Sequence, residues 1–135
     1  MPGKGAPSAH AASWQPQAQP PKVLHALDAA LTPLSPVDDI AQLTALATAA
    51  VQAGHGNVLD ASHVIFPNGA ITLVLILAES HLSIHTWPEE NLIAVDLFSC
   101  GAIDGPRVIS ELVRLLRLES VSVRQLARGT PADRG

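Results

Sequence analysis

The chain has 135 residues, of which 47% are hydrophobic and 15% charged, and its formal net charge is -4 at pH 7. This length suits a single domain with one core, and this composition excludes a wholly disordered chain. Eight Lys and Arg against twelve Asp and Glu leave no broad basic surface, which argues against nucleic acid as a partner.

Residues 1–21 are rich in Pro, Ala, Gln and Ser and show no hydrophobic period. Such a segment cannot bury enough apolar surface to offset the entropy of ordering it, so we expect a disordered N-terminal tail over residues 1–21. The folded domain is then expected over residues 22–127, followed by a polar tail over residues 128–135.

The sequence shows no mark of a secreted or membrane protein. The first residues contain no apolar run typical of a signal peptide, and residues 70–78, the longest apolar run, are about half as long as a membrane helix needs to be. Cys100 is the only cysteine and cannot form an intramolecular disulfide. We therefore expect a cytoplasmic protein without membrane contact.

The first predicted elements are a strand over residues 23–27 and a helix over residues 36–53. Ser35 followed by Pro36 is typical of a helix start, because serine caps the first amides and proline suits the first turn. Apolar residues then recur at helical spacing until Gly54, which is expected to end the helix.

Four β-rich runs follow the first helix, over residues 58–66, 70–78, 81–87 and 93–98. Between the first two, Pro67-Asn68-Gly69 predicts a hairpin turn, and Pro88 to Asn91 predicts a turn between the last two. The chain would thus double back on itself at each turn.

A second helix is expected to open at Asp104-Gly-Pro, and a last strand is expected over residues 121–126. The element order is then β-α-β-β followed by β-β-α-β, a pseudo-repeat. Because each helix has one apolar stripe, the economical packing places both helices on one face of the sheet. We expect an α+β fold, a two-layer α/β sandwich with a mostly antiparallel sheet.

Residues 79–89 differ from a simple core strand, because seven of their eleven side chains are polar or ionisable. A solvent-facing strand with alternating polar residues is one interpretation. A metal site on His81, His85 and Cys100 is another, but His81 and His85 would lie about 13 Å apart on an extended strand, too far to share one ion. A Cys100 nucleophile with a histidine base is a third, without a local signature in its favour.

The dipeptide Glu79-Ser80 allows a further kind of chemistry. A serine hydroxyl can attack the carbonyl of the residue before it, and the resulting ester can lose its carboxylate by β-elimination. Hydrolysis of the dehydroalanine leaves a pyruvoyl group on the new chain end. A pyruvoyl carbonyl forms a Schiff base with an amine and accepts electrons, the role that pyridoxal phosphate has elsewhere.

Two segments carry a resemblance to a known family: residues 79–89, Glu-Ser-His-Leu-Ser-Ile-His-Thr-Trp-Pro-Glu, and residues 94–101, Ala-Val-Asp-Leu-Phe-Ser-Cys-Gly. Together they resemble the processing and active-site segment of the prokaryotic pyruvoyl-dependent S-adenosylmethionine decarboxylase proenzymes. In element order the resemblance covers residues 22–127. It implies a lyase that converts S-adenosylmethionine to its decarboxylated form and CO2 for spermidine and polyamine synthesis.

The resemblance also implies the catalytic residues. Cleavage between Glu79 and Ser80 would give a β chain of residues 1–79 and an α chain of residues 80–135, with Ser80 converted to the pyruvoyl cofactor that holds the substrate as a Schiff base. His85 matches the histidine that accepts a proton during processing. No metal is implied.

Two further residue roles and an oligomeric state follow from the resemblance in the same way. Cys100 matches the cysteine that returns a proton to the substrate carbon after CO2 leaves. Thr72 stands at the distance of a serine that assists processing, and it keeps a hydroxyl. A homodimer of αβ units is implied as well, with residues of both protomers at each site.

Substrate contacts are implied for Phe66, Trp87 and Glu89. Phe66 matches an aromatic residue that stacks on adenine, whereas Trp87 and Glu89 match other positions of the substrate pocket. An aromatic face suits both a purine and a sulfonium cation, and a carboxylate suits ribose hydroxyls.

The sequence departs from the family pattern at several places. Residues 23–28 lack the usual aromatic strand, residues 69–73 replace the usual Gly-Val-Ser-Gly, and Glu90-Asn91-Leu92 replaces the usual Tyr-Gly-Tyr. L-ornithine or L-arginine therefore remains an alternative substrate, with Glu90 as a carboxylate for its terminal cation. An unprocessed, non-catalytic homologue is a further alternative.

Overall fold

The computed structural model describes residues 22–129. In chain order the elements are β1 (Lys22–Ala30), α1 (Ile40–Ala53), β2 (Val58–Ile65), β3 (Ile71–Leu77), β4 (Ser80–Trp87), the 3-10 helix η3 (Pro88–Glu90), β5 (Leu92–Ser99), α2 (Gly105–Leu115) and β6 (Glu119–Arg128). The predicted α+β class and pseudo-repeat are confirmed. The tail predicted over residues 1–21 lies outside the described residues, as do residues 130–135, and β6 includes Arg128 from the predicted C-terminal tail.

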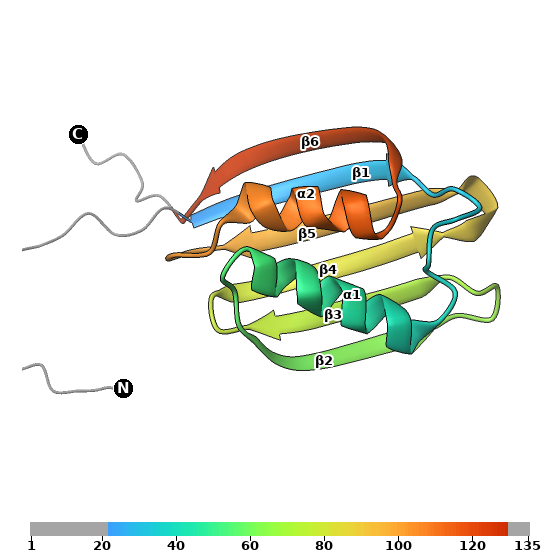
Figure 1. Ribbon diagram of the computed structural model, residues 1–135, viewed down its shortest axis with the longest axis horizontal. Helices are drawn as coiled ribbons and strands as arrows, with labels where there is room; N and C mark the ends of the chain where they lie inside the picture. Colours follow the sequence, from blue (N-terminus) through green and yellow to red (C-terminus); the bar gives the residue numbers. More distant parts are fainter. Residues whose placement is uncertain (1–21, 130–135) are drawn as a thin grey trace, which may run out of the picture.

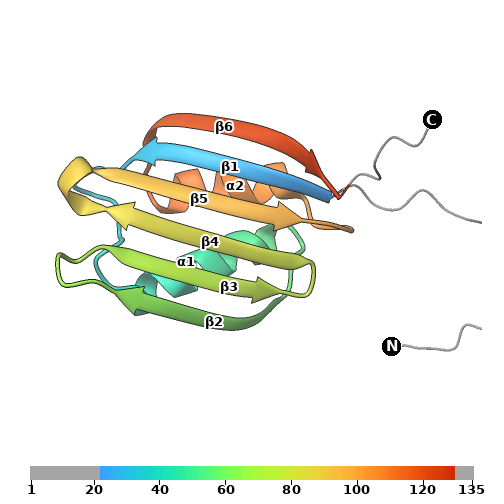
Figure 2. The same cartoon turned by 180° about the vertical axis from the view of Figure 1, so that it is seen from behind.

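The six strands form one sheet in the order β2-β3-β4-β5-β1-β6. Every neighbouring pair is antiparallel. Both helices cover one face of this sheet, and the other face is free of helices (Figures 1 and 2). We call the helix-free side the open face. Strand β4, which carries the unusual polar segment, therefore lies in the middle of the sheet.

Alternation along the strands separates a buried face from the open face. On β4, Leu82, Ile84 and Thr86 are buried, whereas the residues between them are partly accessible or exposed. Because successive side chains point to opposite faces of a strand, His81, Ser83 and His85 belong to the open face. The central strand thus anchors the core with one set of residues and presents the polar set on the other side.

The core lies between the sheet and the two helices. Its fully buried members, each contributing roughly 1.5 to 3 kcal/mol where the side chain is large, include Leu43 and Val51 of α1, Leu112 and Leu116 at α2, and Leu73, Leu75, Val95 and Leu97 of the sheet. These residues fix the position of β3, β4 and β5 from below the open face.

Helix α1 begins at Ile40, so the start predicted at Pro36 is wrong by about one turn. The carboxylate of Asp39 caps the helix by accepting hydrogen bonds from two first-turn amides, at 2.9 and 3.3 Å. The hydroxyl of Ser35 instead accepts a hydrogen bond from the amide of Thr32, at 2.9 Å. Two capping residues compete in this segment, and the charged one caps the helix.

The start of α2 is as expected from Asp104-Gly-Pro. The carboxylate of Asp104 accepts a hydrogen bond from the amide of Arg107 at 3.1 Å. A side chain at Gly105 would collide with the imidazole ring of His25 on β1, so only glycine allows the helix to begin this close to the sheet. His25 is thereby enclosed beneath the first turn of α2.

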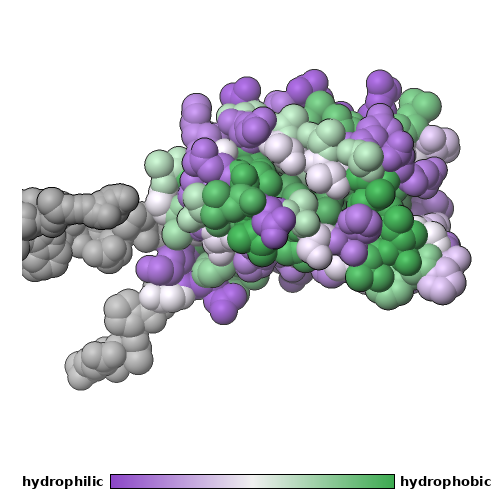
Figure 3. Space-filling model, turned by 90° about the horizontal axis from the view of Figure 1, so that it is seen from below, coloured by the Kyte–Doolittle hydropathy of each residue, from purple (hydrophilic) through white to green (hydrophobic). Residues whose placement is uncertain are grey.

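Several large hydrophobic side chains remain exposed on the sheet. Strand β2 carries Leu59, Val64 and Ile65, each more than half exposed, and Figure 3 views the molecule from the side of this strand, where hydrophobic areas alternate with polar ones. Ile76 on β3 is also exposed. Among residues 22–129, no helix is long and apolar enough to cross a membrane.

Candidate active site

The Glu79–Ser80 bond lies in the tight turn between β3 and β4, where Leu77 and Ser80 are the last paired residues. Ser80 has a backbone φ of 146°, in a region that residues other than glycine rarely adopt. Residues held in such conformations cost about 1 to 3 kcal/mol and persist only where their surroundings enforce them. The bond predicted to break is therefore next to the strained residue.

Cys100 lies beside this bond, because the register of β4 and β5 pairs Ser80 with Ser99. The thiol of Cys100 donates a hydrogen bond to the carbonyl oxygen of Glu79, with Sγ and O 3.2 Å apart. The structure thus brings together three residues that the sequence analysis selected. A donor at this oxygen polarises the carbonyl carbon that the Ser80 hydroxyl would attack.

The carboxylate of Glu79 is held by Asn57, a residue that the sequence analysis missed. The amide nitrogen of Asn57 donates to Oε1 at 3.1 Å, and its side-chain Nδ2 donates to Oε2 at 2.9 Å. The amide of Ala78 in turn donates to the carbonyl of Asn57 at 2.9 Å. The signal available in the sequence was the hairpin register, since pairing of residues 58 and 77 places Asn57 beside the turn.

The hydroxyl of Ser80 lies 3.4 Å from Nδ1 of His81. The His81 ring meets the ring of Phe98 edge-on, with centroids 6.0 Å apart, and the guanidinium of Arg128 lies 5.6 Å from the centroid of Phe98. Strands β4, β5 and β6 thus place a stack of one cation and two rings next to Ser80 on the open face.

A second group of site residues lies at the far end of β4. His85 faces Thr72 across the β3–β4 pair, with Nδ1 and the hydroxyl oxygen 3.1 Å apart. The ring of Trp87 lies 6.1 Å from the His85 ring, centroid to centroid. The hydrogen bond to Thr72 fixes the orientation of the imidazole.

Phe66, Thr72, His85 and Trp87 line a cleft of about 530 Å³ between the β2–β3 turn and the end of β4. The turn is formed as predicted, with Gly69 at a φ of 87°. Glu89 does not line the cleft. Its carboxylate accepts a hydrogen bond from Nδ2 of Asn68, a lining residue, at 2.8 Å, so Glu89 lies at the rim.

His85 and Ser80 are five residues apart on one strand, which separates them by about 16 Å. The structure therefore does not bring His85 to the Ser80 of its own chain. It forms two half-sites, one with Glu79, Ser80 and Cys100, and the other with Thr72, His85 and the cleft.

Within residues 22–129 the structure contains no group of three or more His, Cys, Asp or Glu side chains placed to hold a metal ion. Glu90, the carboxylate considered for an amino-acid cation, is exposed on η3 and does not line the cleft.

The sequence matches the family model described as S-adenosylmethionine decarboxylase over residues 17–129. Among curated relatives, S-adenosylmethionine decarboxylase proenzyme 2 of Bacillus cereus is 40% identical over 85 residues, which cover 62% of this chain and 68% of the relative. The proenzyme of Parasynechococcus marenigrum is 42% identical over 98 residues, covering 71% of this chain and 76% of the relative.

The fold is similar to a solved structure as well. The crystal structure of the adenosylmethionine decarboxylase from Aquifex aeolicus superimposes with a TM-score of 0.70 and 24% sequence identity, covering 87% of this chain and 98% of that one. This likeness supports the two-layer fold that the sequence analysis predicted.

Proposed function

The chain belongs to the S-adenosylmethionine decarboxylase family, and we propose that it cuts itself between Glu79 and Ser80 and then decarboxylates S-adenosylmethionine with the pyruvoyl group formed from Ser80. The observation that carries this proposal is the contact between the Cys100 thiol and the Glu79 carbonyl, beside a serine with strained backbone. These residues supply what self-cleavage requires: a polarised carbonyl, an adjacent hydroxyl and a backbone that gains by rearranging.

The cleavage step balances without any external oxidant. The Ser80 oxygen attacks the Glu79 carbonyl carbon, the peptide C–N bond breaks, and an ester forms. A base removes the Ser80 α-proton while the main-chain carboxylate of Glu79 leaves from the ester. This elimination turns residue 80 into a dehydroalanine. Water then replaces the nitrogen, and ammonia is released with the new pyruvoyl end.

The base for this step is proposed to be His85, acting from a second copy of the chain. His85 cannot reach the Ser80 of its own chain along β4. A two-fold axis between two apposed open faces, at right angles to β4 and level with Ser83, would set each end of β4 against the opposite end of the partner's β4. Each Ser80 half-site would then meet the Thr72–His85 pair of the partner.

The open face supports such a homodimer. It carries Ile76 and Trp87 as exposed large hydrophobic residues, in addition to the polar rows of β4. Contact with a second copy would remove both side chains from water. A two-fold dimer uses the same surface on both copies, so it creates two equal composite sites.

In the cleft, Phe66 and Trp87 are proposed to contact the adenine and the sulfonium of the substrate, and Glu89 at the rim the ribose hydroxyls. The cleft volume of about 530 Å³ is in the range of small-molecule sites. When present, the pyruvoyl group supplies an electron sink for the electron pair that stays on the substrate carbon when the carboxylate leaves as CO2. Cys100, whose thiol contacts the carbonyl of Glu79, is proposed to protonate the substrate carbon.

The family and the relatives favour S-adenosylmethionine over ornithine or arginine. No carboxylate among the described residues lines the cleft to meet a compact terminal cation, and Glu90 is exposed and is not a lining residue. An unprocessed homologue is disfavoured, because the strained Ser80 and the Cys100 thiol are both in place.

We also propose that the protein is located in the cytoplasm, because a proton-donating thiol needs a reducing compartment.

The proposed function is tested by measuring CO2 release side by side from carboxyl-labelled S-adenosylmethionine, ornithine and arginine. We expect release from S-adenosylmethionine alone. Release from ornithine or arginine only would contradict the proposed substrate, while release from none by a fully cleaved protein would remove the enzyme interpretation.

A further inference from the structure

We propose that Asn57 is a positioning residue for self-cleavage, because it fixes the carboxylate of Glu79 and thereby the peptide bond that breaks. This inference rests on the proposed function. Asn57 lies in the loop between α1 and β2, far from Ser80 in sequence. Nothing else among the described residues hydrogen-bonds to the Glu79 carboxylate.

The contact has two points. The backbone amide of Asn57 donates to one carboxylate oxygen and the side-chain Nδ2 donates to the other, at 3.1 and 2.9 Å. Two hydrogen bonds to one carboxylate fix its direction as well as its position, and bonds to a charged acceptor are roughly twice as strong as neutral ones. The side chain of Glu79 is thus held on one side of the turn.

The carbonyl of the same residue is held on the other side by the Cys100 thiol. Glu79 is therefore fixed at both its side chain and its carbonyl, while Ser80 follows with a φ of 146°. A strained conformation persists only where neighbouring contacts determine it. Without Asn57, we expect the turn to relax to an ordinary conformation, which would move the Ser80 hydroxyl relative to the Glu79 carbonyl.

The contact between Asn57 and Glu79 can be tested by exchanging the hydrogen-bond donor and acceptor between the two side chains. In Asn57→Asp, two carboxylates face each other, which destabilises the turn. In Glu79→Gln, the charge of the acceptor is lost. In the double variant, the side-chain amide of the introduced glutamine can donate to the carboxylate of the introduced aspartate, while the glutamine oxygen still accepts from the backbone amide of residue 57. The two-point contact is therefore restored with its side-chain polarity reversed.

The experiment follows cleavage of the full chain after pulse-labelled cell-free synthesis, by denaturing gel and mass. We expect Asn57→Ala to slow cleavage about tenfold to a hundredfold. Asn57→Asp should be at least as slow, and the double variant should return to within about threefold of the unmodified chain. Rescue of this kind distinguishes positioning from a general loss of stability.

A matched control is Asp39→Ala, which removes the N-cap of α1 at the opposite end of that helix. It lowers stability without touching the turn, and it should cleave at the unmodified rate. The melting temperatures of all these variants are compared in chains that also carry Ser80→Ala, so that none of them is cut.

Three outcomes overturn the inference while leaving the proposed function intact: normal cleavage in Asn57→Ala, no recovery in the double variant, or equal slowing in Asp39→Ala. Failure of the unmodified chain to cleave at all would instead overturn the proposed function, and this inference with it.

Discussion

Thr72 and His85 share a hydrogen bond of 3.1 Å across β3 and β4, at the opposite end of β4 from Ser80. The two residues that the family resemblance assigns to processing are thus paired with each other and separated from the bond they would help to cut. This arrangement is the physical reason for expecting two copies of the chain at each site.

Mixed dimers test this expectation. Ser80→Ala and His85→Ala chains, each uncut when alone, are co-expressed with different tags. Because the His85→Ala chain keeps Ser80 and its partner keeps His85, one composite site per mixed dimer is complete. We expect the His85→Ala chain to be cut and the Ser80→Ala chain to stay whole, as read by mass spectrometry. Absence of any cut in the mixture would show that His85 acts within its own chain.

Cys100 is expected to act both in cleavage and in turnover. Removing the donor in Cys100→Ala should slow cleavage about tenfold to a hundredfold, since the Glu79 carbonyl loses one hydrogen bond. Cys100→Ser keeps a donor and should still cleave, yet it should release CO2 poorly because a hydroxyl gives up its proton far less readily. Unchanged turnover in Cys100→Ser would refute the proton-donor role.

The aromatic residues of the cleft are expected to set substrate affinity. Phe66→Ala should raise KM for S-adenosylmethionine about tenfold to a hundredfold, the effect of losing one stacked ring on a base. Phe66→Tyr keeps the ring and should stay within a few-fold, as should the control Leu59→Ala, an exposed residue on the preceding strand β2. An unchanged KM in Phe66→Ala would place the adenine elsewhere.

Much of the fold follows from the sequence, because its signals are local. Alternation on β4 and the Pro67-Asn68-Gly69 turn predicted strands and a hairpin, and Asp104-Gly-Pro predicted the start of α2. The start of α1 did not follow, because Asp39 and Ser35 are both good caps and only the tertiary position of each decides between them.

The site followed from the sequence in part. The polar run of β4 and the neighbouring Cys100 could be selected from the motif, and the register explains why Cys100 reaches Glu79. Asn57 was missed, because its contact joins a loop and a turn that are distant in sequence, and only the register of the β2–β3 hairpin points to it. The separation of Ser80 and His85 becomes informative only once β4 is known to be a continuous strand.

Burial of His25 predicts a pH dependence of stability. The ring is enclosed beneath α2, its Nδ1 has no hydrogen-bond partner among the described residues, and burial lowers the pKa of His25 below its ordinary value. The unfolded chain therefore binds a proton more readily than the folded one. The part of the free energy of unfolding that depends on a neutral His25 is fully present above about pH 6.5, the ordinary histidine pKa. It is lost as the pH falls below that value.

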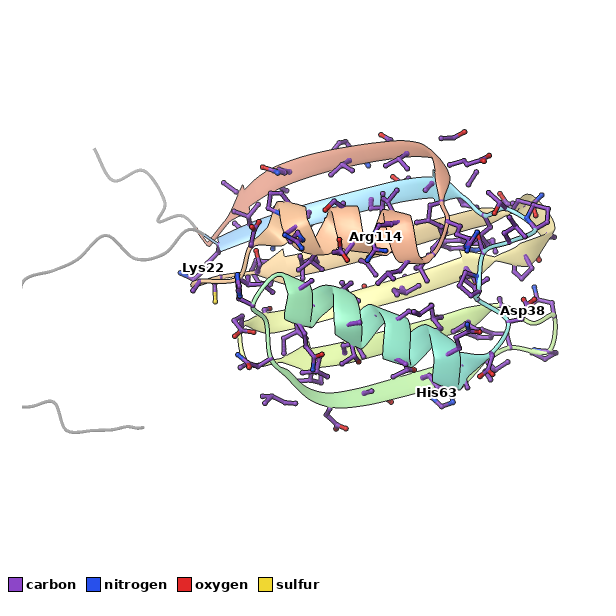
Figure 4. All side chains as sticks on the ribbon, in the orientation of Figure 1. Lys22, Asp38, His63 and Arg114 are labelled. Atoms are coloured by element: carbon purple, nitrogen blue, oxygen red, sulfur yellow. The ribbon has the colours of Figure 1, made fainter. Side chains whose placement is uncertain are left out.

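The measurement is the midpoint of urea unfolding from about pH 8 to about pH 5, a range that brackets the ordinary histidine pKa, in chains with Ser80→Ala so that all stay uncut. We expect stability to fall toward the acid end, and His25→Gln to flatten that part of the profile. The control is His63→Gln, at an exposed histidine on the edge strand β2 (Figure 4). A profile flattened equally by both substitutions would show that His25 is not responsible.

The most direct test of self-cleavage is the intact mass of the purified, folded protein under denaturing conditions. We expect two species, residues 1–79 and residues 80–135, the second lighter than its sequence mass by the change from serine to pyruvoyl and absent in Ser80→Ala. A single species of 14.1 kDa that carries an unmodified serine at position 80 would contradict it.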